Sequence, residues 1–226
     1  MGRLFITGDT HGEIDWQKLN TLHFPVQKSL TKDDYVLICG DFGAIWSGDK
    51  SDKYLQETYA SRNFTTLFVD GNHENHPMIA TYPVEEWHGG LVHRINDSII
   101  HLMRGQVYDI CGKKVFTFGG ARSVDKYLRT MGVDWWPEEM PSKDEMWTAI
   151  HNLEACGNKV DIIVTHCAPA DIVGEMFGIY DTDDCTSFLR LIQHTVDFKD
   201  WYFGHYHVDM DLDQYHARYQ VIDEVK

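Results

Sequence analysis

The sequence is short of positive charge, and this shortage restricts the partners it can have. Its 226 residues contain 20 Lys and Arg against 35 Asp and Glu, which gives a formal net charge of −15. A chain this acidic repels duplex nucleic acid and anionic membranes at long range. It can bind an anion only at a local positive site, and a bound divalent cation is one way to create such a site.

Cysteine pairs, long apolar stretches and linkers are also missing. The five cysteines are odd in number and form no C-x-x-C motif, which indicates reduced thiols in a reducing compartment. No run of about 18 apolar residues predicts a membrane span, and the first residues lack the features of a signal peptide. We therefore expect a cytoplasmic protein. Without repeats or a Pro- or Ser-rich linker, residues 1–226 are predicted to form one domain.

Short apolar runs followed by Gly- or His-rich clusters are the clearest pattern in the chain. Runs of this length and composition are typical of buried strands. They are Leu4–Thr7, Tyr35–Cys39, Thr66–Val69, Ile162–Thr165 and Trp201–Phe203. Helix-like stretches at Ile14–His23 and Asp52–Asn63 separate the first three runs. This β-α-β-α-β order predicts a parallel sheet with right-handed crossovers.

The rest of the chain predicts a second, partly antiparallel arrangement. Short strands joined by tight turns are expected at Val92–Ile95, Ser98–Met103, Gln106–Ile110 and Lys114–Gly119. A helix should run from about Pro141 to Ala155, because Ser142 and Glu145 have the spacing of a capping box. Another is expected at about 182–194, and strands with turns at about 208–223. We predict an α/β fold of two packed sheets.

Metal-ligand residue types lie just after the five apolar runs. In open α/β sheets, ligands bind at the carboxyl ends of the strands. Seven such residues occur there: Asp9, His11, Asp41, Asn72, His166, His205 and His207. Seven donors suit two metal ions that share one carboxylate, and imidazole with carboxylate favours Mn, Fe, Zn or Ni. Each residue alone is more typical of a turn or a solvated loop; the ordered set of five clusters is not.

The motif order resembles that of the calcineurin-like metallophosphoesterases. G-D-x-H, G-D, G-N-H-E, a later His and G-H-x-H appear in sequence between Gly8 and His207. The resemblance implies a two-sheet β-sandwich of mixed strands flanked by helices, with metals at the strand ends. It also implies hydrolysis of a phosphomonoester or phosphodiester by a metal-bridging hydroxide held between two divalent transition-metal ions.

The resemblance also implies a role for each matching residue. Asp9, His11 and His207 would bind the first metal, and Asp41 would bridge both. Asn72, His166 and His205 would bind the second. His73 matches the family's catalytic histidine, which is not a ligand but contacts the phosphate and protonates the leaving group.

One departure from the family pattern changes the expected site. Many members continue the second motif as G-D-x-x-D-R, whereas this chain has Ala44 and Ile45 at the Asp and Arg positions. His73 then needs another orienting partner, for which Asp70 and Glu74 are candidates, and nearby His76 is a possible outer-sphere residue.

A replacement phosphate-binding group is available in the run 119–129. Arg122 and Arg129 follow a predicted strand there, and either guanidinium could pair with phosphate oxygens. An ordinary helix start with solvated charges and an Asp125–Arg129 pair is an equally good interpretation.

The function hypothesis is a metal-dependent phosphoesterase for a small organophosphate or nucleotide. One rival is a single-strand nuclease that stacks bases on Trp135 and Trp136, although Trp pairs more often serve packing. The other is a non-catalytic scaffold, which would be expected to have lost ligands, and none is missing. The oligomeric state is left open by the sequence.

Overall fold

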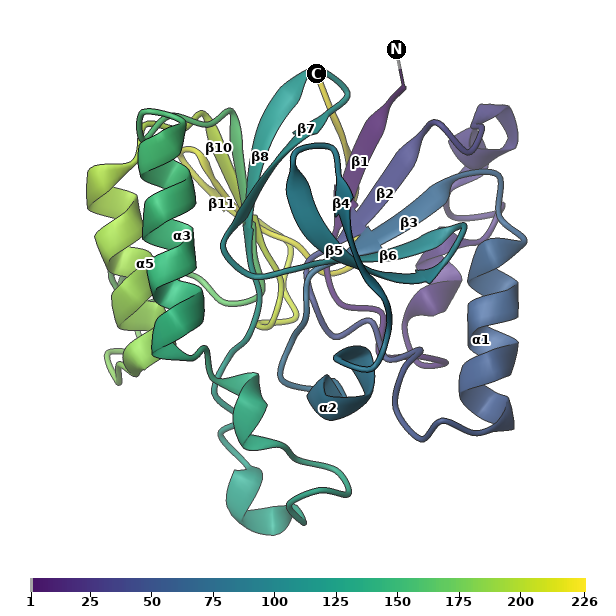
Figure 1. Cartoon of the computed structure of the whole chain (residues 1–226), viewed down its shortest axis with the longest axis horizontal. Coiled ribbons are helices and arrows are strands. Elements are labelled where there is room, and N and C mark those ends of the chain that lie inside the picture. Colours follow the sequence, from purple (N-terminus) through teal and green to yellow (C-terminus); the bar gives the residue numbers. More distant parts are fainter. Residues whose placement is uncertain (1) are drawn as a thin grey trace.

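Two mixed sheets form the centre of the protein (Figure 1). The computed structural model describes residues 2–226. The first sheet has the order β13 (Ile222–Val225), β1 (Leu4–Thr7), β2 (Tyr35–Ile38), β3 (Thr65–Phe68), β6 (Ile99–Leu102), β5 (Gly90–Asn96) and β4 (Val84–Trp87). The second has the order β11 (Met210–Leu212), β12 (Tyr215–Ala217), β10 (Asp200–Phe203), β9 (Ile162–Thr165), β8 (Lys113–Phe118) and β7 (Gln106–Ile110).

The parallel strands at the middle of each sheet are apolar on both faces. β1, β2, β3 and β6 run parallel, and so do β8, β9, β10 and β12. Along β1, Leu4 and Ile6 join the core between the two sheets, while Phe5 joins the core on the outer face. A strand covered on both sides needs such a continuous apolar run. The predicted fold class is confirmed.

Helices flank the two sheets. They are α1 (Lys50–Ala60), α2 (His76–Ile79), α3 (Lys143–Ala155), α4 (Ala170–Phe177) and α5 (Asp184–Thr195). In Figure 1, α1 lies beside the first sheet, and α3 and α5 lie beside the second. The predicted capping box of α3 is confirmed, because Ser142 and Glu145 bond to each other's backbone N–H.

Several predictions of local structure were wrong. Residues 14–23 form turns and a 3-10 helix, Trp16–Leu19, because the Asn20 side chain accepts the N–H groups of Leu22 and His23 and ends the helix. A second 3-10 helix follows at Pro25–Ser29. Three further elements, α2, α4 and β4, were not predicted from the sequence. The four short strands predicted in the middle of the chain are confirmed, and they form two antiparallel hairpins, β5–β6 in one sheet and β7–β8 in the other.

The connection between β8 and α3, residues 119–142, projects from the sandwich. Figure 1 shows it as the teal-green segment below the two sheets, near α2. It contains two further 3-10 turns, Lys126–Leu128 and Pro137–Glu139. We call these residues the β8–α3 connection. Its two ends return to the strand ends where the predicted ligands lie.

Candidate metal centre

The predicted ligands come from the carboxyl ends of strands in both sheets. Asp9, Asp41 and Asn72 follow β1, β2 and β3, while His166 follows β9 and His205 follows β10. Because the sheets pack face to face, these five turns meet at one end of the sandwich. Loops far apart in the chain therefore face one another.

Asp9 and Asp41 lie at the centre of the cluster. Both are buried, with exposures of 0% and 1%. Asp41 Oδ2 lies 3.3 Å from His11 Nε2, and its Oδ1 lies 3.5 Å from His166 Nε2. Asp41 thus reaches toward both sides, as a bridging carboxylate would.

Asp9 also extends to both sides, whereas the family resemblance assigned it to the first metal alone. Its Oδ2 lies 3.1 Å from His207 Nε2 and 3.9 Å from His11 Nε2, and its Oδ1 lies 4.0 Å from His166 Nδ1. Two groups of side chains have the spacing of metal ligands, Asp9–His11–His207 and Asp9–Asp41–His166, and Asp9 belongs to both.

The remaining two predicted ligands also lie in this cluster. Asn72 Oδ1 is 3.0 Å from His166 Nε2. The ring of His205 packs edge-on against the His166 ring at 5.0 Å, and its backbone N–H donates to the Asp9 carboxylate at 3.0 Å. All seven predicted ligands are thus brought together.

Hydrogen bonds set which nitrogen each histidine presents. His11 Nδ1 donates to Asp15 Oδ2 at 2.8 Å, and His166 Nδ1 donates to the Cys39 carbonyl at 2.7 Å. In the neutral form each ring then has its lone pair at Nε2, facing the carboxylates. The two atoms in contact with His166 Nε2, Asn72 Oδ1 and Asp41 Oδ1, are both hydrogen-bond acceptors.

The donor set therefore fits divalent metal ions. The ion pairs of Asp9 and Asp41 involve histidines, and no Arg or Lys among residues 2–226 joins them. Buried carboxylates without a protein cation are costly unless another cation is bound. Mixed imidazole, carboxylate and amide donors suit transition metals.

The backbone is held in a rare conformation at four of the seven residues. His11, Asp41, His205 and His207 have positive φ values of 41°, 48°, 67° and 51°. Such strain in non-glycine residues clusters at functional sites. Neighbouring Gly71 is needed for a different reason, because a Cβ there would lie 2.0 Å from Asp41 Oδ1.

The pKa values of these histidines reflect burial and the carboxylates. Burial alone would lower the pKa of His11, but its hydrogen bond to Asp41 and the nearby Asp9 charge raise it to about 9. Burial lowers the pKa of His205 to about 4, and the adjacent His166 contributes to this. For His207, the hydrogen bond to Asp9 raises the pKa.

His73 lies at the edge of the cluster. Its backbone N–H donates to Asp41 Oδ1 at 2.7 Å, and its ring is 5.7 Å from the His11 ring. The guanidinium of Arg129 contacts the His73 ring, with Nη1 3.1 Å from Nδ1 and Nη2 3.2 Å from Nε2. Burial lowers the pKa of His73, and the Arg129 charge lowers it further. The Asp125 carboxylate holds Arg129 through two bonds of 2.9 Å.

Arg122 and Trp136 are engaged in other contacts of the fold. Arg122 pairs with Asp181 and lies 3.6 Å from Asp183, in the segment before α5. Trp136 is buried and packs edge-on against Trp46 at 5.1 Å, so it is a packing residue rather than an open stacking surface.

Neither candidate for orienting His73 does so. Asp70 binds Arg104 Nε at 2.9 Å and His101 Nε2 at 3.2 Å instead. Glu74 Oε1 accepts the backbone N–H of Phe42 and so supports the second motif turn. Both expectations were wrong, because each carboxylate is used to hold a loop in place. His76 lies 3.4 Å from Asp70, behind the ligand loop.

Several residues that hold the ligand loops in place were not predicted from the sequence. Lys18 is buried, and its Nζ donates to the carbonyls of Gly8 at 2.9 Å, Asp9 at 2.7 Å and Tyr219. No local pattern identifies a lysine that binds carbonyls this way. Asp15, four residues after His11, is the one partner that spacing alone suggests. Ser123 contacts Asn72, and Glu139 contacts Ser123, because the β8–α3 connection folds back on the site.

A cavity of about 330 Å³ opens beside His11 and His73. Ile14, Trp46 and Leu55 give it apolar walls. A volume of this size is at the lower end of the range for small-molecule sites. It is adjacent to the cluster, so a small molecule bound there would lie next to His11 and His73.

Comparison with known proteins agrees with this geometry. The family model of the calcineurin-like phosphoesterases matches residues 2–209, so the chain belongs to that family. It is therefore a phosphoesterase, a hydrolase whose family uses divalent metal ions. No curated protein matches the sequence. Within residues 2–226, no helix has the length and hydrophobicity needed to span a bilayer.

Proposed function

We propose that this protein is a dinuclear metal-dependent phosphoesterase that hydrolyses a small phosphate ester, an organophosphate or a nucleotide. The observation that carries the proposal is the pair of buried carboxylates, Asp9 and Asp41, surrounded by imidazole nitrogens and without an Arg or Lys partner in the described part of the chain. Mn, Fe, Zn or Ni ions are the proposed cofactors.

The proposed ligands divide into two sets, one on the His11 side of Asp41 and one on the His166 side. Asp9, His11 and His207 would hold one ion, and Asn72, His166 and His205 the other, with Asp41 between them. Bound there, the ions would supply positive charge for the phosphoryl oxygens and for activating water. Asp15 and the Cys39 carbonyl keep the two Nε2 atoms of His11 and His166 directed inward.

His73 and Arg129 are proposed to act on the substrate. His73 lies beside the cluster and the 330 Å³ cavity, where its ring can donate a proton to the departing oxygen. Arg129 lies against it and can bind a phosphate oxygen. It is thus the chain's replacement for the arginine absent at Ile45, and Arg122 is the weaker candidate because Asp181 already pairs with it.

Replacement of His73 by Ala tests this assignment. The proposal predicts unchanged metal content, because His73 is not a ligand, and turnover slowed by about 10²–10⁴-fold, the usual contribution of a proton donor. Metal analysis and the rate on a chromogenic ester measure the two effects. Full activity, or loss of the metal, would contradict the role.

The function itself is tested by a metal panel. Chelated protein is reloaded separately with Mn, Fe, Zn or Ni and given a monoester and a diester of one chromogenic alcohol. We expect turnover of at least one ester with at least one metal. Failure with all four metals on both esters would exclude catalysis on such substrates and favour a scaffold.

A further inference from the structure

The amide of Asn72 has only one orientation that suits a metal ligand. A carboxamide binds a cation through its oxygen, whereas its NH₂ group can only donate hydrogen bonds. Asn72 Oδ1 lies 3.0 Å from His166 Nε2, inside the cluster, and Nδ2 lies 3.1 Å from Ser123 Oγ on the opposite side. A reversal of the amide would place the NH₂ group where a ligand is needed.

Glu139 determines the direction of this hydrogen bond. Its Oε1 accepts the backbone N–H of Ser123 at 3.0 Å, and its Oε2 accepts the Ser123 hydroxyl at 2.5 Å. A carboxylate only accepts, and a hydroxyl has one proton, so Ser123 donates that proton to Glu139. Toward Asn72, Ser123 can then only accept. Asn72 must present Nδ2 to it and Oδ1 to the cluster.

We propose that Ser123 and Glu139 are positioning residues that fix the Asn72 oxygen toward the second metal ion. This inference rests on the proposed metal centre. All three side chains are buried, with exposures of 5% for Asn72, 2% for Ser123 and 1% for Glu139, so water does not compete for their hydrogen bonds. We call the chain of contacts from Glu139 through Ser123 to Asn72 the relay.

The relay also gives the β8–α3 connection a role in the site. Ser123 lies near its start and Glu139 near its end, and their two hydrogen bonds close the base of the projecting segment. Arg104 holds the same end by donating to the Glu138 carbonyl at 2.8 Å. The connection thus orients Asn72 at its base and carries Arg129 to His73 further along.

Substitution of Glu139 by Gln reverses the direction of the relay with almost no change in shape. The Gln oxygen would accept the Ser123 backbone N–H, and the Gln NH₂ would then donate to Ser123 Oγ. The Ser123 proton would point to Asn72, which could accept it only through Oδ1. The amide would turn its NH₂ group toward His166, and one ion would lose a ligand.

Calorimetric titration of the chelated protein with Mn²⁺ measures this effect without any substrate. We expect Glu139→Gln to weaken the binding of one Mn²⁺ equivalent by about 10–100-fold, as for other outer-sphere partners. Glu138→Gln is the matched control. Glu138 is the residue before Glu139, but its side chain is exposed and is not part of the relay, so this variant should bind Mn²⁺ like the wild type. Thermal unfolding confirms that each variant is folded. If the Glu139→Gln variant does not fold, the Ser123→Ala variant is used in its place. We again expect weaker binding of one Mn²⁺ equivalent.

The double variant Asn72→Asp with Glu139→Gln makes the test specific. The carboxylate introduced by Asn72→Asp can accept the redirected Ser123 proton with one oxygen and present the other to the ion, so Mn²⁺ affinity should recover. A wild-type affinity in Glu139→Gln, or a loss that Asn72→Asp does not restore, would overturn the relay. Wild-type protein that binds neither Mn²⁺ nor any of Fe²⁺, Zn²⁺ and Ni²⁺ would overturn the metal centre itself.

Discussion

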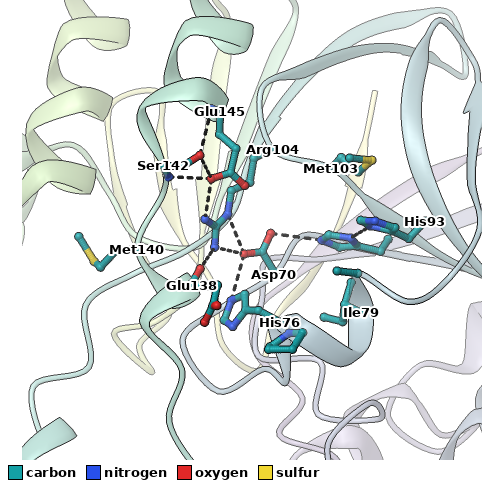
Figure 2. Close-up of a pocket in the computed structure, with 13 residues that line it drawn as sticks. Asp70, His76, Ile79, His93, Met103, Arg104, Glu138, Met140, Ser142 and Glu145 are labelled. Atoms are coloured by element: carbon teal, nitrogen blue, oxygen red, sulfur yellow. Dashed lines mark hydrogen bonds and ion pairs between the residues drawn. The ribbon is translucent and has the colours of Figure 1, made fainter. Parts of the chain in front are cut away.

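Two buried polar clusters lie on either side of one loop, and they differ in where their positive charge comes from. On one side, Asp70 is surrounded by Arg104, His76 and His101, and Figure 2 shows Arg104 and His76 turned toward it. Two to three residues further along the chain, Asn72 and His73 join the cluster of Asp9 and Asp41, whose ion pairs within residues 2–226 are made by histidines and not by arginine.

The comparison shows how to tell a structural carboxylate from a ligand. Burial would raise the pKa of Asp70, but the Arg104 charge and hydrogen bonds from histidines hold it well below its usual range. Asp70 is thus compensated mainly by an arginine, whereas the pKa of Asp41 is also lowered but by histidines alone. Among the described residues, Asp9 and Asp41 form their ion pairs with imidazoles alone, and a bound metal ion would supply the positive charge that Arg104 supplies to Asp70. A cavity of about 420 Å³ adjoins the Asp70 cluster.

The largest effect is expected when the metal cluster loses a shared carboxylate. Asp41→Asn keeps the size of the side chain but removes the charge that lies between His11 on one side and His166 on the other. We expect loss of Mn²⁺ binding and of measurable turnover, since Asp41 contacts both His11 and His166. Metal analysis and ester hydrolysis measure this. If the Asp41→Asn variant still binds both ions, Asp41 is not needed as a ligand, and the distinction between the metal cluster and the Asp70 cluster is wrong.

A second change removes the protein's own cation from the Asp70 cluster. Arg104→Met leaves Asp70 buried with only His76 and His101 as partners, so the free energy of unfolding should fall by about 3–5 kcal/mol. Arg3→Met is the matched control, because Arg3 pairs with Glu224 at the surface and such pairs contribute about 0–1 kcal/mol. Urea unfolding of both chelated variants measures the difference. Equal losses would show that burial of the pair is unimportant.

The smallest effect is a pH dependence of stability at the edge of the Asp70 cluster. Burial lowers the pKa of His93 to about 4, and neighbouring His101 contributes. Because its pKa is higher in the unfolded chain, the unfolded state binds more protons between about pH 4 and 6.5. The stabilisation from neutral His93 is complete above about 6.5 and is lost as the pH falls toward 4.

Melting temperatures at pH 7.5 and 4.5 test this dependence. We expect a smaller fall for His93→Gln than for the wild type. His151→Gln, an exposed position on α3, should behave like the wild type. If His93→Gln falls just as far, His93 does not contribute to the acid sensitivity of the fold.

Much of the site could be read from the sequence because its residues follow buried strands directly. The apolar runs predict β1, β2, β3, β9 and β10, and a ligand one to four residues past a strand end has little freedom to lie elsewhere. The helix expected at 14–23 was wrong because helical spacing cannot reveal that the Asn20 side chain binds the backbone. The prediction that Asp70 or Glu74 orients His73 was also wrong, because Arg129, which is 56 residues away in the chain, contacts the His73 ring instead.

The sequence by itself determined the family, the two-sheet fold and the seven residues at the strand ends, since these depend on local patterns and their order. Only the tertiary structure decided the roles of Lys18, Arg104, Ser123 and Glu139, and the sharing of Asp9 between both ligand groups. Their contacts join segments that local patterning leaves independent. The direction of a buried hydrogen bond depends on which donors and acceptors the folded chain brings together.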